Sequence, residues 1–204
     1  PEALTDPSYF GQILIFTYPL IGNYGVPPSS TEGGFFQYFE SKRIQAAGMV
    51  VADYSFEYSH WLAERSLDDW LKKEGVPGIY GVDTRALTKK LRKEGTMLAK
   101  IIVDKEEVDF YDPNRVNLLP KVSVRSPIEY GEGDLKIALL DCGVKHSIIR
   151  SLIKRGVKVI RLPYDYDIFK LEFDGLLISN GPGNLKQCKK TIKLVKEAMK
   201  KEMP

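Results

Sequence analysis

The strongest constraint on the fold is an alternation of apolar strands and a helix in the last third of the sequence. Apolar segments at 136–141 and 157–162 predict buried strands, and the helical spacing of 144–155 separates them. A third apolar segment follows at 175–179. Strands that alternate with a helix form a parallel sheet with right-handed connections. The sequence therefore predicts an α/β fold that binds ligands at the carboxyl ends of these strands.

The third of these strands ends in an abrupt Gly-Pro-Gly loop within Ser179–Gly183. Gly181 and Gly183 carry no Cβ to shield their backbone N–H groups, and a helical pattern follows at 185–203, so a small anion or oxyanion could bind there. The loop after Asp141 is expected at the same edge of the sheet, where both loops would share one crevice. Periodicity alone leaves open the alternative that Gly-Pro-Gly is only a turn.

The first part of the sequence is organised differently, with short apolar strands at 12–16 and 48–52 between turn-forming residues. One helix is expected to begin after Ser66, whose hydroxyl can cap free N–H groups, and to end near Gly75.

A second helix is expected over Asp83–Glu94. The start, Asp83-Thr84-Arg85, could be taken for a catalytic trio, but Asp83 as an N-cap explains it more simply. The spacing places Ala86, Leu87 and Leu91 on the inward face.

A region without sustained periodicity, 109–134, lies between these two patterns and contains several prolines and glycines. We predict a first domain at 1–125, a linker at 126–135 and a second domain at 136–204. With 204 residues, the chain is long enough for one large or two small domains.

Composition excludes several classes of protein. Two cysteines are too few for a disulfide framework and leave open only a single bridge, and two histidines make a metal site unexpected. We expect a cytoplasmic protein without a membrane span or signal peptide.

Residues 185–204 hold seven lysines against two glutamates, but their helical spacing and the absence of aromatic residues favour a solvated helix face over nucleic-acid binding. A nucleotide-binding domain is disfavoured because Leu140–Gly143 lacks the glycine fingerprint.

Five segments, in order, carry a resemblance that runs the length of the chain: Pro1–Tyr9, Thr17–Gly25, Gly81–Thr88, Asp141–Lys145 and Ser179–Gly183. Together they resemble the small chain of carbamoyl-phosphate synthase. The resemblance implies a mixed α/β N-terminal domain, followed by the first half of a class I glutamine amidotransferase domain with an open, mainly parallel sheet.

Class I amidotransferases hydrolyse glutamine through a cysteine thioester and need fixed N–H donors for the oxyanion. By resemblance, the Gly181 N–H would donate to that oxyanion and Gly183 would line the glutamine site. Ser8 would hold the amino-acid end of glutamine. Lys145 matches a family lysine beside the active site, where its ammonium could steady a carboxylate or cap nearby carbonyls.

The resemblance places the nucleophilic cysteine, histidine and glutamate beyond Pro204, so the chain is expected to be a fragment that is inactive alone. Cys142 and Cys188 are expected to be structural, because neither has a histidine in a recognisable pattern. His60 and His146 receive no catalytic role. One departure from the family follows Gly183, where Asn184-Leu185-Lys186 replaces a frequent proline.

The resemblance also implies partners. Ammonia from L-glutamine would pass to a large synthetase chain or fused region, which uses ATP and Mg to form carbamoyl phosphate for pyrimidine or arginine synthesis. The chain itself is expected to bind no cofactor, metal, nucleic acid or membrane. The alternative is a non-catalytic docking domain of an ammonia-dependent, mitochondrial synthase.

Overall fold

A computed structural model describes residues 1–18, 20–105 and 107–204 of the chain. Pro19, inside the Thr17–Gly25 segment, therefore lies outside the described residues. Contacts divide the chain into two compact units, Pro1–Asp112 and Pro113–Pro204, and each is described by itself. None of the described helices is both long enough and apolar enough to cross a membrane.

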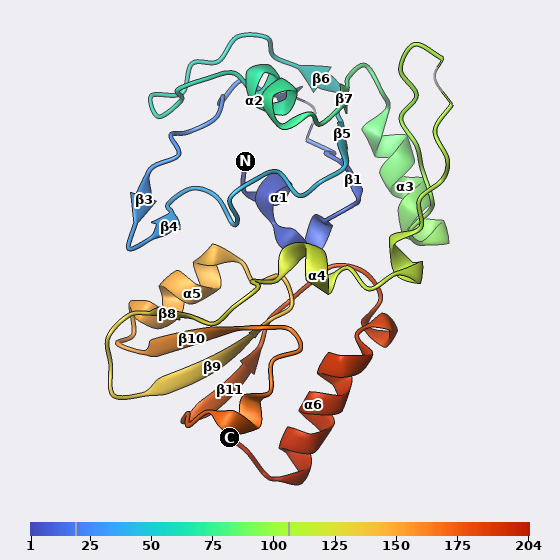
Figure 1. Cartoon of the computed structure of the whole chain (residues 1–204). Helices are drawn as coiled ribbons and strands as arrows, with labels where there is room; N and C mark the ends of the chain where they lie inside the picture. The colour runs from blue at the N-terminus through green and yellow to red at the C-terminus, as the bar shows by residue number, and fades with distance from the viewer. Residues whose placement is uncertain (19, 106) are drawn as a thin grey trace. The chain divides into compact units, whose positions relative to one another are not determined.

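Unit 1 is built on small sheets with helices beside them (Figure 1). Three parallel strands form its largest sheet in the order β1 (Ile13–Ile15), β5 (Gly48–Val50), β7 (Gly78–Ile79). The first two lie within the predicted strands at 12–16 and 48–52. The remaining elements of this unit are α1 (Glu2–Thr5), the 3-10 turn η1 (Pro7–Tyr9), β2 (Leu20–Ile21), β3 (Thr31–Glu32), β4 (Phe35–Phe36), β6 (Asp53–Tyr54), α2 (Leu67–Glu74) and α3 (Thr84–Glu94).

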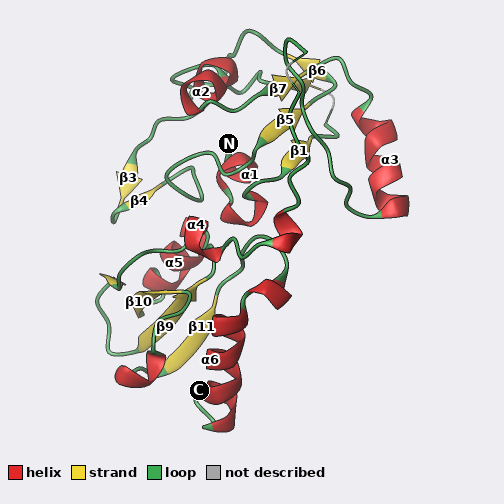
Figure 2. Cartoon of the chain, turned by 45° about the vertical axis from the view of Figure 1, so that its right-hand side comes forward, coloured by secondary structure: helices red, strands yellow, loops and turns green. Residues whose placement is uncertain are grey.

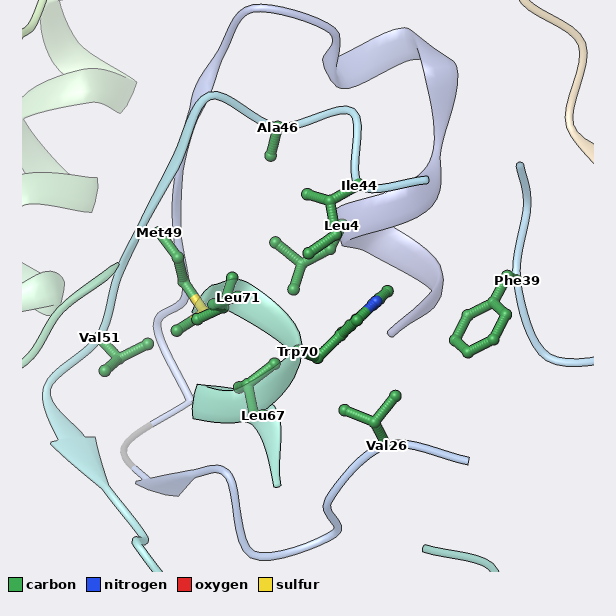
Figure 3. Packing of buried hydrophobic residues seen from close by; sticks show 10 residues of the cluster. All are labelled: Leu4, Val26, Phe39, Ile44, Ala46, Met49, Val51, Leu67, Trp70 and Leu71. Carbon is green, nitrogen blue, oxygen red and sulfur yellow. The ribbon is translucent and has the colours of Figure 1, made fainter. Parts of the chain in front are cut away.

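The core of unit 1 forms around α2 (Figure 3). Leu67, Trp70 and Leu71 are the buried residues of this helix, and their spacing places all three on one face. The rings of Phe39 and Trp70 lie 5.3 Å apart. Burial of large aromatic and aliphatic side chains is the main source of stability in a unit whose strands are this short.

Both ends of α2 confirm the sequence-based prediction. The Ser66 hydroxyl accepts the Asp69 N–H at 3.0 Å, and Gly75 ends the helix with a left-handed φ of 68°. A glycine adopts this conformation without the penalty that a Cβ imposes. The helix limits are therefore set by local chemistry.

The cap supplies a first prediction. Replacing Ser66 with Ala leaves the Asp69 N–H without its acceptor, so the free energy of unfolding should fall by about 1 kcal/mol. Urea unfolding followed by the fluorescence of Trp70 would measure the change. Ser66→Asn keeps an accepting oxygen and is the matched control. Equal loss in both variants would contradict a capping role.

The α3 helix confirms its predicted cap but not its predicted inner face. Asp83 accepts the Ala86 N–H at 2.9 Å, as expected of an N-cap. Ala86 itself is exposed, Leu87 and Leu91 are half-buried, and Thr84 is the only residue of the helix that is buried. The prediction for Ala86 was wrong because α3 contacts the unit only along a narrow stripe, which its spacing does not reveal.

Unit 2 contains a four-stranded sheet in the order β11 (Gly175–Ile178), β9 (Lys136–Asp141), β10 (Lys158–Pro163), β8 (Ile128–Tyr130). The pairs β11–β9 and β9–β10 are parallel, and only β8 is antiparallel. This confirms the predicted α/β class and the mainly parallel sheet (Figure 1).

Helices cover this sheet. The buried residues Ala138, Leu140 and Ile160 share one face and form a core with Ala198 of α6 (Lys189–Lys200). Side chains of alternate residues point to the opposite face, where α5 (His146–Ile153) packs against β10. Figure 2 shows α6 running alongside β11.

Two features of unit 2 differ from the predictions. The region 109–134, expected to be irregular, contains three elements that belong to unit 2: the 3-10 turn η2 (Pro113–Arg115), the helix α4 (Leu119–Val122) and β8. The helix predicted from Leu185 begins instead at Lys189, after the 3-10 turn η4 (Leu185–Gln187). Asn184 causes this delay because its side chain accepts the Lys186 N–H at 3.0 Å and favours a tight turn. The 3-10 turn η3 (Ile168–Lys170) completes the unit.

Candidate active site

Asp141, at the carboxyl end of β9, anchors the loop edge of the sheet. It is fully buried, and one carboxylate oxygen accepts the N–H groups of Gly143 and Val144 at 2.9 Å each. The other oxygen accepts the Val124 N–H at 2.8 Å. A carboxylate satisfied by this many donors fixes the backbone around it.

The charge of Asp141 is balanced from the neighbouring strand. Arg161 of β10 donates to it through Nε at 2.9 Å and Nη2 at 2.8 Å. In the β9–β10 register Arg161 lies opposite Leu139, so its side chain shares a face with that of Asp141. Both N–H groups reach the same oxygen, Oδ2, and hydrogen bonds between ionised groups are stronger than those between neutral groups.

The loops after β9 and β11 are joined by side chains of the Ser179–Gly183 segment. The Ser179 hydroxyl accepts the Cys142 N–H at 2.8 Å, and the Asn180 amide donates to the Gly143 carbonyl at 3.2 Å. The two loops therefore meet at the carboxyl edge of the sheet, as the sequence predicts for this topology.

Gly181 lies directly against the first of these loops. A Cβ added to Gly181 would stand 2.0 Å from the Cys142 carbonyl oxygen and 2.9 Å from its carbon. Only glycine permits this approach. Among the described residues no acceptor is bonded to the Gly181 N–H, so this donor is available to a ligand.

Gly183 is required for a different reason. Its φ of 76° lies in the left-handed region, and an added Cβ would also lie 3.2 Å from Leu118 Cδ1 and 3.3 Å from the Pro113 carbonyl oxygen. The backbone turn, more than crowding, demands glycine here. Gly183 is exposed at the end of the loop.

The other predicted site residues are placed as follows. Ser8 belongs to unit 1, in the turn η1, where its N–H donates to Asp6 at 2.9 Å and its carbonyl accepts the Gln12 amide at 3.1 Å. Lys145 is half-buried at the N-cap position of α5, in the loop that Asp141 holds.

Cys142 and Cys188 are both buried free thiols, and they share a small apolar cluster with Leu119. Burial raises the pKa of the Cys142 thiol to about 12, and the nearby charges of Asp141 and Cys188 add to the effect. Burial also raises the pKa of Cys188. A nucleophilic cysteine needs the opposite shift, so the structural interpretation of both residues is favoured.

These shifts predict low thiol reactivity. Because the pKa of Cys142 rises from 9.0 to about 12, its thiolate fraction at pH 8 should be roughly 10³-fold lower in the folded chain than in the unfolded chain. Iodoacetamide labelling at pH 8, read by mass spectrometry, would compare the native chain with the chain in guanidinium. Rapid native labelling of Cys142 would contradict the burial argument.

The two histidines belong to different units, His60 to unit 1 and His146 to unit 2. His60 Nδ1 accepts the Leu62 N–H at 3.2 Å, and its ring lies 5.5 Å from that of Trp61. His146 is buried at the start of α5. The described residues contain no group of three or more histidine, cysteine, aspartate or glutamate side chains that could hold a metal ion.

Sequence reasoning missed the pair of Asp141 and Arg161 and the bridging roles of Ser179 and Asn180. A signal for the pair was present, because an acidic residue at the end of a buried apolar strand requires a cationic or N–H partner. The strand predicted at 157–162 offers two cations, Lys158 and Arg161, and the observed register selects Arg161 because it lies opposite Leu139.

Comparison with known proteins identifies two families in the chain. Residues 1–101 match "Carbamoyl-phosphate synthase small chain, CPSase domain", and residues 138–204 match "Glutamine amidotransferase class-I". The second match begins within β9 and contains Asp141, Gly181 and Gly183.

Individual relatives match over nearly the whole chain. An arginine-specific carbamoyl phosphate synthase small chain of Phaeosphaeria nodorum is 51% identical over 94% of the chain, and the multifunctional protein CAD of Squalus acanthias is 48% identical over 100%. The human mitochondrial carbamoyl-phosphate synthase [ammonia] is 50% identical over 90%. The chain spans 42%, 9% and 12% of the lengths of these relatives, respectively.

Proposed function

Because the chain belongs to the carbamoyl-phosphate synthase small-chain family, with a class I glutamine amidotransferase region, we propose that it forms part of a glutaminase. In this proposal it supplies ammonia for carbamoyl phosphate formation. The observation that carries the proposal is the Gly181 N–H, which no acceptor among the described residues engages, on a loop clamped against Cys142. A preorganised backbone donor of this kind stabilises the oxyanion of amide hydrolysis.

The proposal gives each site residue a task. The Gly181 N–H donates to the developing oxyanion, and Gly183 lines the glutamine site. Ser8 holds the amino-acid end of L-glutamine, and Lys145 stands beside the active site. The proposal assigns no residue of the chain as the nucleophilic cysteine or as its histidine and glutamate partners, so the chain alone is proposed to be inactive.

The proposed partner is a large synthetase chain or a fused synthetase region, which would use ATP and Mg. Support comes from the names of the relatives, which include both a separate small chain and a multifunctional protein. The name of the small-chain relative indicates arginine synthesis, and pyrimidine synthesis is the other proposed pathway.

The proposed location is the cytoplasm. The proposed domain limits are 1–125 and 136–204, with a linker between them.

A second candidate is a docking domain without glutaminase activity. It is favoured by the human relative, whose name specifies ammonia and which is 50% identical to the chain. In that case Gly181 and Gly183 would preserve the loop structure without serving catalysis.

The test uses the full-length natural protein with its synthetase region, and it measures carbamoyl phosphate formed from glutamine and from ammonia. The glutaminase proposal expects both nitrogen donors to work. Ser8→Ala should raise the KM for glutamine about 10- to 100-fold, the worth of a hydrogen bond to a charged group, with ammonia kinetics unchanged. Activity with ammonia alone would instead establish the docking domain.

A further inference from the structure

Unit 1 contains a cavity of about 200 Å³ whose lining is strongly cationic. Four cationic side chains and one carboxylate, Glu74, line it among other residues. The cations come from two segments far apart in sequence: Lys42 and Arg43 precede β5, whereas Arg65 and Lys73 flank or belong to α2. An excess of positive charge around a concave space focuses the field on a small anion.

The main evidence for a bound anion comes from Arg65. Its Nε is buried and has no hydrogen-bond partner among the described residues, while Nη2 donates to the Ser29 hydroxyl at 3.2 Å. A guanidinium cannot discard its charge by losing a proton, and a buried donor left unbonded is costly. An anionic acceptor in the cavity would satisfy it.

The rest of the lining supports an anion. Trp70 also lines the cavity, and the hydrogen bonds of the described residues include none from its indole N–H. Lys42 and Lys73 are exposed, so their flexible ammonium groups can reach a ligand at the opening. The carboxylate of Glu74 already has a partner, because one of its oxygens accepts the Ile44 N–H at 3.3 Å.

We propose that this cavity is a binding site for a small oxyanion of the phosphate class. Donors converge on it from several directions, which suits the many acceptor oxygens of a phosphate better than the two of a carboxylate. The volume of about 200 Å³ accommodates such an anion with some of its water. The site lies entirely within unit 1 and uses none of the residues proposed for glutamine hydrolysis.

Isothermal titration of the full chain with inorganic phosphate, at constant ionic strength maintained with chloride, tests the proposal. We expect saturable binding of one phosphate. Arg65→Gln and Lys73→Gln should each weaken it at least tenfold. Lys90→Gln removes the same charge from the exposed surface of α3, outside the cavity, and should leave binding unchanged.

Arg65→Lys keeps the charge but removes the planar fork, and it should bind phosphate less tightly than the natural chain. This variant and Lys73→Gln remain informative if Arg65→Gln does not fold, which thermal unfolding would reveal. The proposal is overturned if phosphate gives no saturable binding. Equal weakening in Lys90→Gln and Lys73→Gln would also overturn it, because the attraction would then be general and not local.

Discussion

Replacing Asp141 with Asn is expected to lower the free energy of unfolding of unit 2 by about 3–5 kcal/mol, the usual cost of removing one partner of a buried ion pair. Arg161, whose side chain is only 12% exposed, would keep its charge without the carboxylate that balances it. An amide also has one accepting oxygen in place of two, so the N–H groups now bonded to Asp141 would compete for it.

Hydrogen exchange read by mass spectrometry on peptides from 136–163 would measure this change. Both tryptophans of the chain, Trp61 and Trp70, lie in unit 1, so their fluorescence gives a separate record of that unit. We expect the urea midpoint seen by tryptophan fluorescence to stay nearly constant.

Asp165→Asn is the matched control, because it also breaks an ion pair of unit 2. Asp165 lies 2.9 Å from Lys190, whose side chain is 73% exposed. Such pairs contribute about 0–1 kcal/mol, since water and salt screen them. If both variants lost the same small amount, Asp141 would not be the anchor that its contacts indicate.

The parts of the fold that depend on local chemistry could be predicted from the sequence. The strand at 136–141 was predicted with the limits that β9 has, because a continuous apolar run of that length has few alternatives. Ser66 and Asp83 could be predicted as N-caps because the hydrogen bond that caps each helix joins residues only three positions apart. The meeting of the two loops followed from topology alone.

The parts that depend on distant partners could not be predicted. The strand β8 has three residues and exists because it pairs with β10, some thirty positions later. The contact of Asp141 with Arg161 requires the register of β9 on β10. The close approach of Gly181 to Cys142 joins residues 39 positions apart, and no pattern within either loop encodes it.

Because Gly181 lies so close to Cys142, Gly181→Ala is expected to displace the loop and to abolish the proposed oxyanion site. The new Cβ would stand 2.0 Å from a backbone carbonyl oxygen, which cannot rotate away as a side chain can. The Cys142 N–H is itself held by Ser179, so the clash falls on backbone that is fixed on both sides. In the full-length protein, loss of one oxyanion donor should lower glutamine-dependent turnover by about 10²–10³-fold.

Gly175→Ala is the control for this substitution. It adds the same methyl group at the start of β11, and the only atom it meets is Ile137 Cδ1 at 2.9 Å, the far end of a flexible side chain. We expect this variant to retain most of its glutamine-dependent turnover. Ammonia-dependent turnover, measured in parallel, should change little in either variant if the synthetase region is intact. Preserved glutamine use in a folded Gly181→Ala protein would exclude the Gly181 N–H as the oxyanion donor, because the altered backbone could not present it in the same position.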